Sequence, residues 1–127
     1  MSLQVELVSP ERILYSGEAE MVIARTTGGD IAFLTGHAPF VGALGVGKVI
    51  IRETAGTSVV AAVHGGFVEI KDNRVSILSD VAELSTQIDV ARAREALGRA
   101  GDDDAARRRA EVRLDAAGES TAAGASH

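Results

Sequence analysis

The stretch GGFVEIKDNRVSILSDVAEL, residues 65–84, marks a change from one kind of secondary structure to another. Side chains of two kinds alternate along residues 67–71 and 75–79, which is the period of a β-strand with two unlike faces. Asp72 and Asn73 separate the two runs, and both residue types tolerate the positive φ of a two-residue hairpin turn. The stretch therefore predicts a β-hairpin, with strand-like sequence before it and helix-like sequence after residue 88.

The sequence before this hairpin consists of short apolar runs with turn residues every 6–12 positions. This pattern predicts an N-terminal antiparallel β-sandwich, or flattened barrel, of about ten short strands over residues 1–86. Residues 31–34, IAFL, have no polar face, so we expect them to form a central strand. Residues 41–47 contain three glycines, which favours a bent strand or a bulge.

The sequence after the hairpin has the period of an α-helix. Asp89, or a capping box that begins at Thr86, is expected to start a first helix, and Gly101 to end it. A second helix is expected to start at the acidic residues 102–104, because carboxylates stabilise the positive end of the helix dipole. The apolar faces are Val90, Ala93, Leu97 and Ala100 in the first helix and Ala106, Ala110, Leu114 and Ala117 in the second.

The predicted fold class is therefore mainly β plus α. We expect a sandwich at residues 1–86, a C-terminal two-helix hairpin at residues 87–117 and a disordered tail at residues 118–127. The two helices expose narrow, alanine-rich apolar faces, so the hairpin is expected to bury little apolar area and to adhere weakly to the sandwich.

Composition excludes several classes of function. The chain has no cysteine, so it forms no disulfide and performs no thiol chemistry. Its formal net charge of −5 argues against general nucleic-acid binding, which needs a basic surface. The longest aliphatic run, residues 59–63, is far too short to span a membrane, and the first residues do not resemble a secretory signal. We expect a soluble protein on the cytoplasmic side that reaches a membrane only through partners.

Motifs for catalysis and metal binding are weak. Residues 28–30, GGD, do not form a P-loop because no Lys-Ser/Thr pair follows them, and they predict a turn. His37 and His64 adjoin Gly/Pro and Gly-Gly segments, so we interpret them as loop histidines that hydrogen-bond to the backbone. No spacing of histidines and carboxylates suggests a shared metal ion. The residues alone indicate a non-enzymatic β-sandwich with a helical hairpin, and they leave its function open.

Several segments resemble signatures of one known family. They are IAFLTGHAPF at residues 31–40, GGFVEI at residues 65–70, NRVSILSDVAE at residues 73–83, and the N-terminal pattern VELVSPERILYSGEAEMVIARTTGGDIAFL at residues 5–34. In this order and spacing they resemble the epsilon subunit of F-type ATP synthases. The resemblance covers residues 3 to about 117, and it departs from the family at Thr35, where a proline is usual.

The resemblance implies a non-catalytic subunit of the central stalk, or rotor, that couples rotation of the c-ring to ATP synthesis. The sandwich would lie between the gamma subunit and the c-ring, and the hairpin would either fold on the sandwich or extend toward the alpha and beta subunits and inhibit ATP hydrolysis. The implied location is the cytoplasmic face of the cell membrane, as a peripheral part of the complex. No cofactor is required and no nucleic acid is bound.

The resemblance also implies two sets of site residues. The run IDVARA at residues 88–93 matches the I/L-D-x-x-R-A motif that binds regulatory ATP in some bacterial members. The implied ATP ligands are Glu83, Ile88, Asp89, Arg92, Ala93 and Arg99. Arg109 and Arg113, one helical turn apart, would contact an acidic segment of the beta subunit.

Other interpretations of these residues stay open. Asp89 could serve only as a helix cap, Arg92 could pair with nearby acids, Arg107 could pair with Glu111, and the arginines of the second helix could form a solvated face. The second helix is also short for the family, which argues against strong inhibition. For the whole chain, the alternative functions are a free-standing β-sandwich that acts as a ligand-binding or adaptor module, and a small hydrolase that uses His37 or His64.

Overall fold

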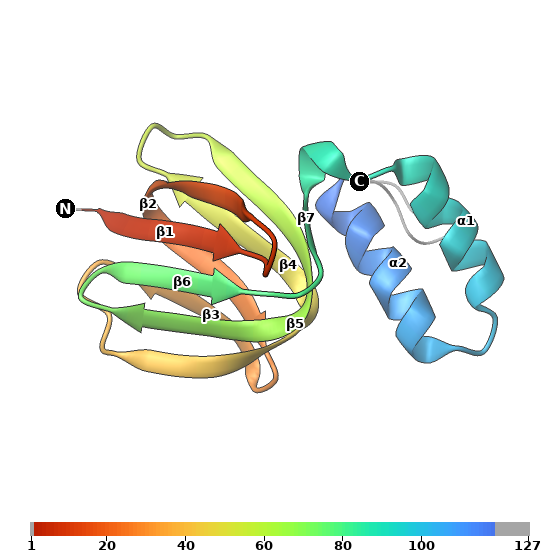
Figure 1. The fold of residues 1–127 in the computed structure, drawn as a ribbon, viewed down its shortest axis with the longest axis horizontal. Helices are drawn as coiled ribbons and strands as arrows, with labels where there is room; N and C mark the ends of the chain where they lie inside the picture. Colours follow the sequence, from red (N-terminus) through yellow and green to blue (C-terminus); the bar gives the residue numbers. More distant parts are fainter. Residues whose placement is uncertain (1, 119–127) are drawn as a thin grey trace.

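The computed structural model describes residues 2–118, which form seven strands followed by a two-helix hairpin (Figure 1). The strands are β1 (Leu3–Val8), β2 (Ile13–Thr26), β3 (Gly29–Leu34), β4 (Phe40–Glu53), β5 (Ser58–Lys71), β6 (Arg74–Leu78) and β7 (Ala82–Leu84). A 3-10 turn, Ser85–Gln87, leads into α1 (Val90–Ala100) and α2 (Asp104–Ala116). The disordered tail predicted from residue 118 lies, from residue 119 onward, outside the described residues.

The strands are fewer and longer than the ten short strands predicted. β2, β4 and β5 have 14 residues each and run through positions at which the pattern suggested that one short strand ended and the next began. In β5 these positions are Gly65 and Gly66, whose φ angles of 93° and 121° bend the strand without ending it. Glycine therefore marks bends within long strands here, whereas the sequence pattern suggested separate short ones.

The strands form one sheet that closes on itself. Their order is β1-β6-β5-β4-β2-β3, and β1 also pairs with β2, which completes a flattened barrel. All pairs are antiparallel except β1 with β6, which run parallel. β3 pairs with β2 alone, so the prediction that residues 31–34 form a central strand is wrong. Only Phe33 of these four residues is buried in the core, and Leu34 is exposed at this edge.

The interior is almost entirely aliphatic. Residues from β1 to β6 contribute to it, and Phe33 is its single buried aromatic side chain among residues 2–118. The predicted hairpin between β5 and β6 is confirmed, because Asp72 and Asn73 have φ angles of 51° and 60° at its turn. Asn73 also fixes the neighbouring loop, since its Oδ1 accepts a hydrogen bond of 2.7 Å from the backbone N–H of Gly36.

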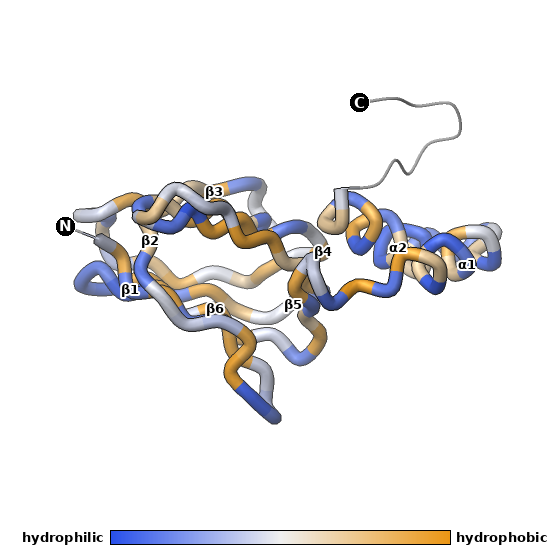
Figure 2. Tube along the Cα trace, turned by 90° about the horizontal axis from the view of Figure 1, so that it is seen from above, coloured by the Kyte–Doolittle hydropathy of each residue, from blue (hydrophilic) through white to orange (hydrophobic). Residues whose placement is uncertain are grey.

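The helical hairpin lies beside the barrel, and α2 lies between the strands and α1 (Figure 1). Asp89 caps α1, with its Oδ1 3.0 Å from the backbone nitrogen of Arg92. Asp103 caps α2 in the same way. The capping box proposed at Thr86 does not start α1, because Ser85–Gln87 forms the separate 3-10 turn. The hairpin and the strand layers occupy opposite ends of the molecule in the perpendicular view (Figure 2).

Candidate functional site: the joint between sandwich and hairpin

The joint between the sandwich and the hairpin has a small apolar centre. Ala62 on β5 is fully buried there, together with Ile88 and Ala116, and Val60, Val112 and Ala117 pack around them. Ala62 lies between Ala61 and Val63, whose side chains enter the barrel core, so three consecutive residues are buried. Since neighbours on a strand point to opposite faces, Ala62 faces outward and is covered by the hairpin.

Two opposite sides of α2 are buried. Val112 and Ala116 belong to the apolar centre of the joint. Ala110 and Leu114, which are also buried, lie about half a helical turn away from Val112 and therefore on the side that faces α1. The predicted apolar face of α2 included Ala110 and Leu114 but missed the Val112–Ala116 side. That second side is what fixes α2 to the sandwich.

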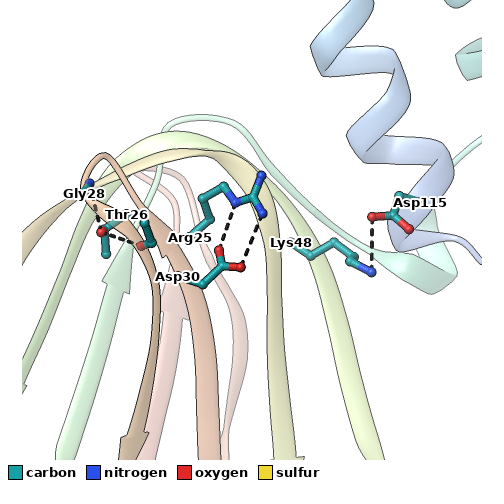
Figure 3. A network of polar contacts seen from close by, with 7 residues as sticks. Arg25, Thr26, Gly28, Asp30, Lys48 and Asp115 are labelled. Atoms are coloured by element: carbon teal, nitrogen blue, oxygen red, sulfur yellow. Dashed lines mark hydrogen bonds and ion pairs between the residues drawn. The ribbon is translucent and has the colours of Figure 1, made fainter.

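Two ion pairs of opposite polarity flank the apolar centre. Arg113 of α2 holds Glu83 of β7 through two contacts, Nε to Oε1 at 2.7 Å and Nη2 to Oε2 at 3.2 Å. Lys48 of β4 reaches Asp115 of α2 at 3.1 Å (Figure 3). Because the sandwich supplies one anion and one cation, the two pairs together favour a single orientation of α2 on the sheet.

Arg25 adds to the positive surface opposite Asp115. Its guanidinium is held by Asp30 on β3, with Nε 2.9 Å from Oδ1, next to the Lys48–Asp115 pair (Figure 3). Asp30 raises the pKa of Arg25, and Asp115 contributes in the same direction. The carboxylate of Asp115 therefore faces two cations of the sandwich.

A hollow of about 400 Å³ lies on the other side of the joint. It is lined by His64, Val81, Glu83, Ala96, Ala106, Arg109, Ala110 and Arg113. His64 is in the middle of β5 and not in a loop, so the prediction of a loop histidine is wrong for this residue. Its Nδ1 is buried without a hydrogen-bond partner among the described residues. Burial lowers the pKa of His64, and Arg113 and Arg109 lower it further, while Glu83 acts in the opposite direction.

The residues suggested for ATP binding do not all meet in this arrangement. Glu83 lines the hollow, but its carboxylate is held by Arg113. Ile88 and Ala93 are buried, and Asp89 is the cap of α1. Arg92 is exposed, and Arg99 is exposed beside Glu95 at 3.9 Å. The structure instead brings Glu83 together with Arg109 and Arg113, the two residues suggested for contact with a partner subunit.

Two smaller expectations are settled by contacts elsewhere. Arg107 forms its ion pair with Asp104, at 3.7 Å, and not with Glu111 as one alternative had it. It also donates a hydrogen bond to the carbonyl of Gly101. His37 behaves as a loop histidine, with its Nδ1 2.7 Å from the carbonyl oxygen of Ala38 and its ring packed edge-on against Phe33.

A second surface of the sandwich is apolar and open. Phe67 and Leu78 are neighbours across β5 and β6 and expose 59% and 52% of their surface. With Val8 and Pro10 they line a shallow groove. Exposed apolar side chains gathered in this way are typical of a surface that contacts another protein.

Comparison with known proteins identifies the family. Residues 2–85 match the model of the ATP synthase delta/epsilon chain beta-sandwich domain. A Streptomyces griseus protein named ATP synthase epsilon chain is 51% identical over 114 residues, which is 88% of this chain and 92% of that protein. The chain belongs to the ATP synthase epsilon chain family. A Brevibacillus brevis epsilon chain is 45% identical over 88% of this chain and 77% of its own length.

Solved structures share the fold of this epsilon-family chain. One chain of the Euglena gracilis mitochondrial ATP synthase, in a structure of OSCP, F1 and c-ring, superposes with a TM-score of 0.72 at 23% identity, covering 90% of this chain and 76% of that one. A chain of the Tetrahymena thermophila mitochondrial ATP synthase, from its central stalk and c-ring, superposes with a TM-score of 0.62 at 18% identity, covering 91% and 96%. The family model ends at residue 85, so the joint described above connects the sandwich domain that the model covers to the two-helix hairpin that follows it.

Proposed function

We propose that this epsilon-family chain is a non-catalytic subunit of the central stalk of an F-type ATP synthase, where it links the gamma subunit to the c-ring and transmits rotation. The identity of 51–53% to Streptomyces epsilon chains, over 88–91% of the chain, is the observation that carries this proposal. Within residues 2–118 no helix is long and apolar enough to cross a membrane. As part of this proposal, gamma and the c-ring hold the protein at the cytoplasmic face of the membrane.

The non-catalytic part of the proposal is supported by the surroundings of the histidines. In the described part of the chain, no hydrogen bond joins His37 or His64 to a hydroxyl or a carboxylate that could act with it. A nucleophile and base within hydrogen-bonding distance of each other are the usual signature of a hydrolase site. The exposed groove at Phe67 and Leu78 supplies a surface for a stalk partner instead.

Purification from membranes tests the rotor proposal. The tagged chain is expected to copurify with the gamma and c subunits. Replacing Phe67 and Leu78 together by serine is expected to reduce this recovery, while the same change at the exposed Val41 serves as a control. A chain recovered without gamma and c subunits would favour a free-standing adaptor. Loss of ATP hydrolysis by the complex with His37→Ala would favour a catalytic role.

We also propose that the hairpin regulates hydrolysis by alternating between the docked position and an extended one, and that ATP is a regulatory ligand of this hairpin. In the docked arrangement Arg113 binds Glu83, so a nucleotide phosphate that recruits Arg113 would compete with this ion pair. Calorimetry with millimolar MgATP tests the ligand. Heat is expected for the full chain and a reduced heat for Arg113→Gln, and the absence of heat with the full chain would contradict ATP binding.

A further inference from the structure

His64 lies at the point where the hairpin covers the sandwich. It follows Ala62 by two positions on β5, so its side chain starts from the same outward face that α2 covers. Its backbone nitrogen donates to the carbonyl of Val81 at 3.0 Å, which fixes this part of β5 against the segment that leads into β7. Helix residues Ala106, Ala110 and Arg113 form the opposite wall of the hollow that His64 lines.

The buried nitrogen of the imidazole has no hydrogen-bond partner that would favour the charged form among the described residues, and the nearby carboxylate of Glu83 is the one group that raises its pKa. Nδ1 is buried and unpaired among the described residues, so a proton placed there would have no acceptor. The charged groups that face His64 are Glu83 from β7 and Arg109 and Arg113 from α2, and the α1 residue in the hollow, Ala96, carries no charge. The carboxylate of Glu83 is already paired with Arg113. A protonated His64 would therefore lie beside two cations and one carboxylate whose charge is already compensated.

We propose that this joint is a pH-sensitive contact in which protonation of His64 releases the helical hairpin from the sandwich. Release moves Arg109 and Arg113 away, exposes the imidazole to water and leaves Glu83 free to pair with the imidazolium. The inference rests on the proposed mobility of the hairpin, but it requires no role in ATP hydrolysis. It can therefore be tested on the isolated full chain.

The direction of the effect follows from proton linkage. Burial, aided by both arginines, holds the pKa of His64 below its ordinary value in the docked state. A released hairpin removes the cover and the arginines, so the pKa rises again and the released state binds more protons at a given acidic pH. Docking is therefore at full strength above about pH 6.5 and weakens as the pH falls from there toward the lowered pKa. The ratio of docked to released chains is expected to fall by up to about tenfold per pH unit in this window.

A distance measurement in the full chain tests the inference. Because the chain has no cysteine, Glu20→Cys on β2 and Ala105→Cys on α2 introduce unique labelling sites for an interprobe distance. Both positions are exposed. The population with the short distance is expected to decrease on acidification below about pH 6.5. In His64→Gln, which keeps a polar side chain that does not titrate, this decrease should be absent.

A matched control and a second measurement distinguish the protonation of His64 from other effects of acid on the chain. His37→Gln removes a histidine whose contacts are with Phe33, Phe40 and Ala38, and it should keep the full pH response. Nuclear magnetic resonance of the imidazole should show His64 titrating below the ordinary range in the unmodified chain. In Ala116→Glu, which places a charge in the apolar centre and releases α2, titration should return toward the ordinary range. Equal acid responses in the unmodified chain and in His64→Gln would overturn the inference, as would a hairpin that stays docked throughout.

Discussion

Gly66 occupies a position in β5 that other residues cannot take without strain. Its φ angle is 121°, and an added Cβ would meet the carbonyl oxygen of Leu78 and lie 2.9 Å from Cα of Ser79. Gly66→Ala is expected to lower the free energy of unfolding by roughly 1–3 kcal/mol from the backbone conformation alone, with the steric clash added to it. Urea denaturation measures this loss.

Gly98→Ala is the matched control for this substitution. An added Cβ at Gly98, in α1, has no neighbour within 4 Å, and its φ is not in the left-handed region. Alanine should raise helix stability there by up to about 1 kcal/mol. Equal effects of the two substitutions would show that the bend in β5 is not the constraint that the structure suggests.

Tyr15 gives a spectroscopic test of a side-chain contact between β2 and β4. Its hydroxyl donates to Oε2 of Glu53 at 2.6 Å, and burial, together with this bond, raises its pKa from 10.0 to about 12. Since the folded state holds the proton more tightly, the stabilisation is complete below pH 10 and is lost as the pH rises toward 12. The chain has one tyrosine and no tryptophan, so near-ultraviolet absorbance follows this group alone.

Glu53→Gln is expected to move that titration down toward 10 without reaching it, because the burial of Tyr15 remains. A midpoint unchanged by Glu53→Gln would contradict the hydrogen bond, and a midpoint near 10 in the unmodified chain would contradict the burial.

Single residues with a strong conformational preference could be predicted from the sequence. Asp72 and Asn73 were assigned to a hairpin turn and Asp89 to a helix cap, and both are confirmed because the preference depends on atoms within a few positions. His64 was misinterpreted as a loop residue, and the runs on either side of Gly65 and Gly66 were expected to be separate strands. Whether a Gly-Gly pair ends a strand or bends it depends on its strand neighbours, here β4 and β6, which a local pattern does not contain.

At the scale of elements, the limit of the sequence pattern is clearest in α2. Periodicity identified the side that faces α1, because Ala106, Ala110 and Leu114 recur at helical spacing. The side that faces the sandwich consists of Val112 and Ala116, and this short apolar pair is not distinctive in a helix rich in alanine. Its role depends on Ala62 and Ile88, and the segment that leads to Ile88 is brought to Ala62 by the pairing of β7 with β5.

The two ion pairs of the joint should differ in their contribution to docking. The side chains of Arg113 and Glu83 expose 24% and 28% of their surface, and those of Lys48 and Asp115 expose 34% and 57%. Solvent screens the second pair more strongly, and exposed pairs contribute about 0.2–1 kcal/mol. Glu83→Gln is therefore expected to lower the docked population more than Asp115→Asn in the two-label distance assay.

This comparison belongs at about pH 8, where His64 is neutral and does not add its own effect. Added salt should reduce the effect of Asp115→Asn more than that of Glu83→Gln. The reverse order of the two variants would mean that Lys48 and Arg25, and not Arg113, hold the hairpin.

For the whole molecule, the same joint serves two requirements of the proposed function. The closed barrel has an aliphatic core from six strands, whereas the hairpin is attached through a few small side chains and two partly exposed ion pairs. A barrel that transmits rotation must keep its shape, while a regulatory hairpin must detach at modest free-energy cost. Undocking α2 leaves the barrel core intact, because Ala61 and Val63 face inward and the β5 residues that lose their cover, Val60, Ala62 and His64, face outward.

Regulation by the hairpin predicts opposite effects for two changes that both abolish docking. Ala116→Glu keeps both helices but disrupts their contact with Ala62, so it should raise the extended population and lower ATP hydrolysis by the membrane complex. Deleting residues 89–127 removes the helices altogether and should raise hydrolysis. Ala105→Glu, at an exposed position of α2, is the control and should leave the rate unchanged. If the point variant and the deletion changed hydrolysis in the same direction, the docked hairpin itself, and not the extended one, would be the inhibitory state.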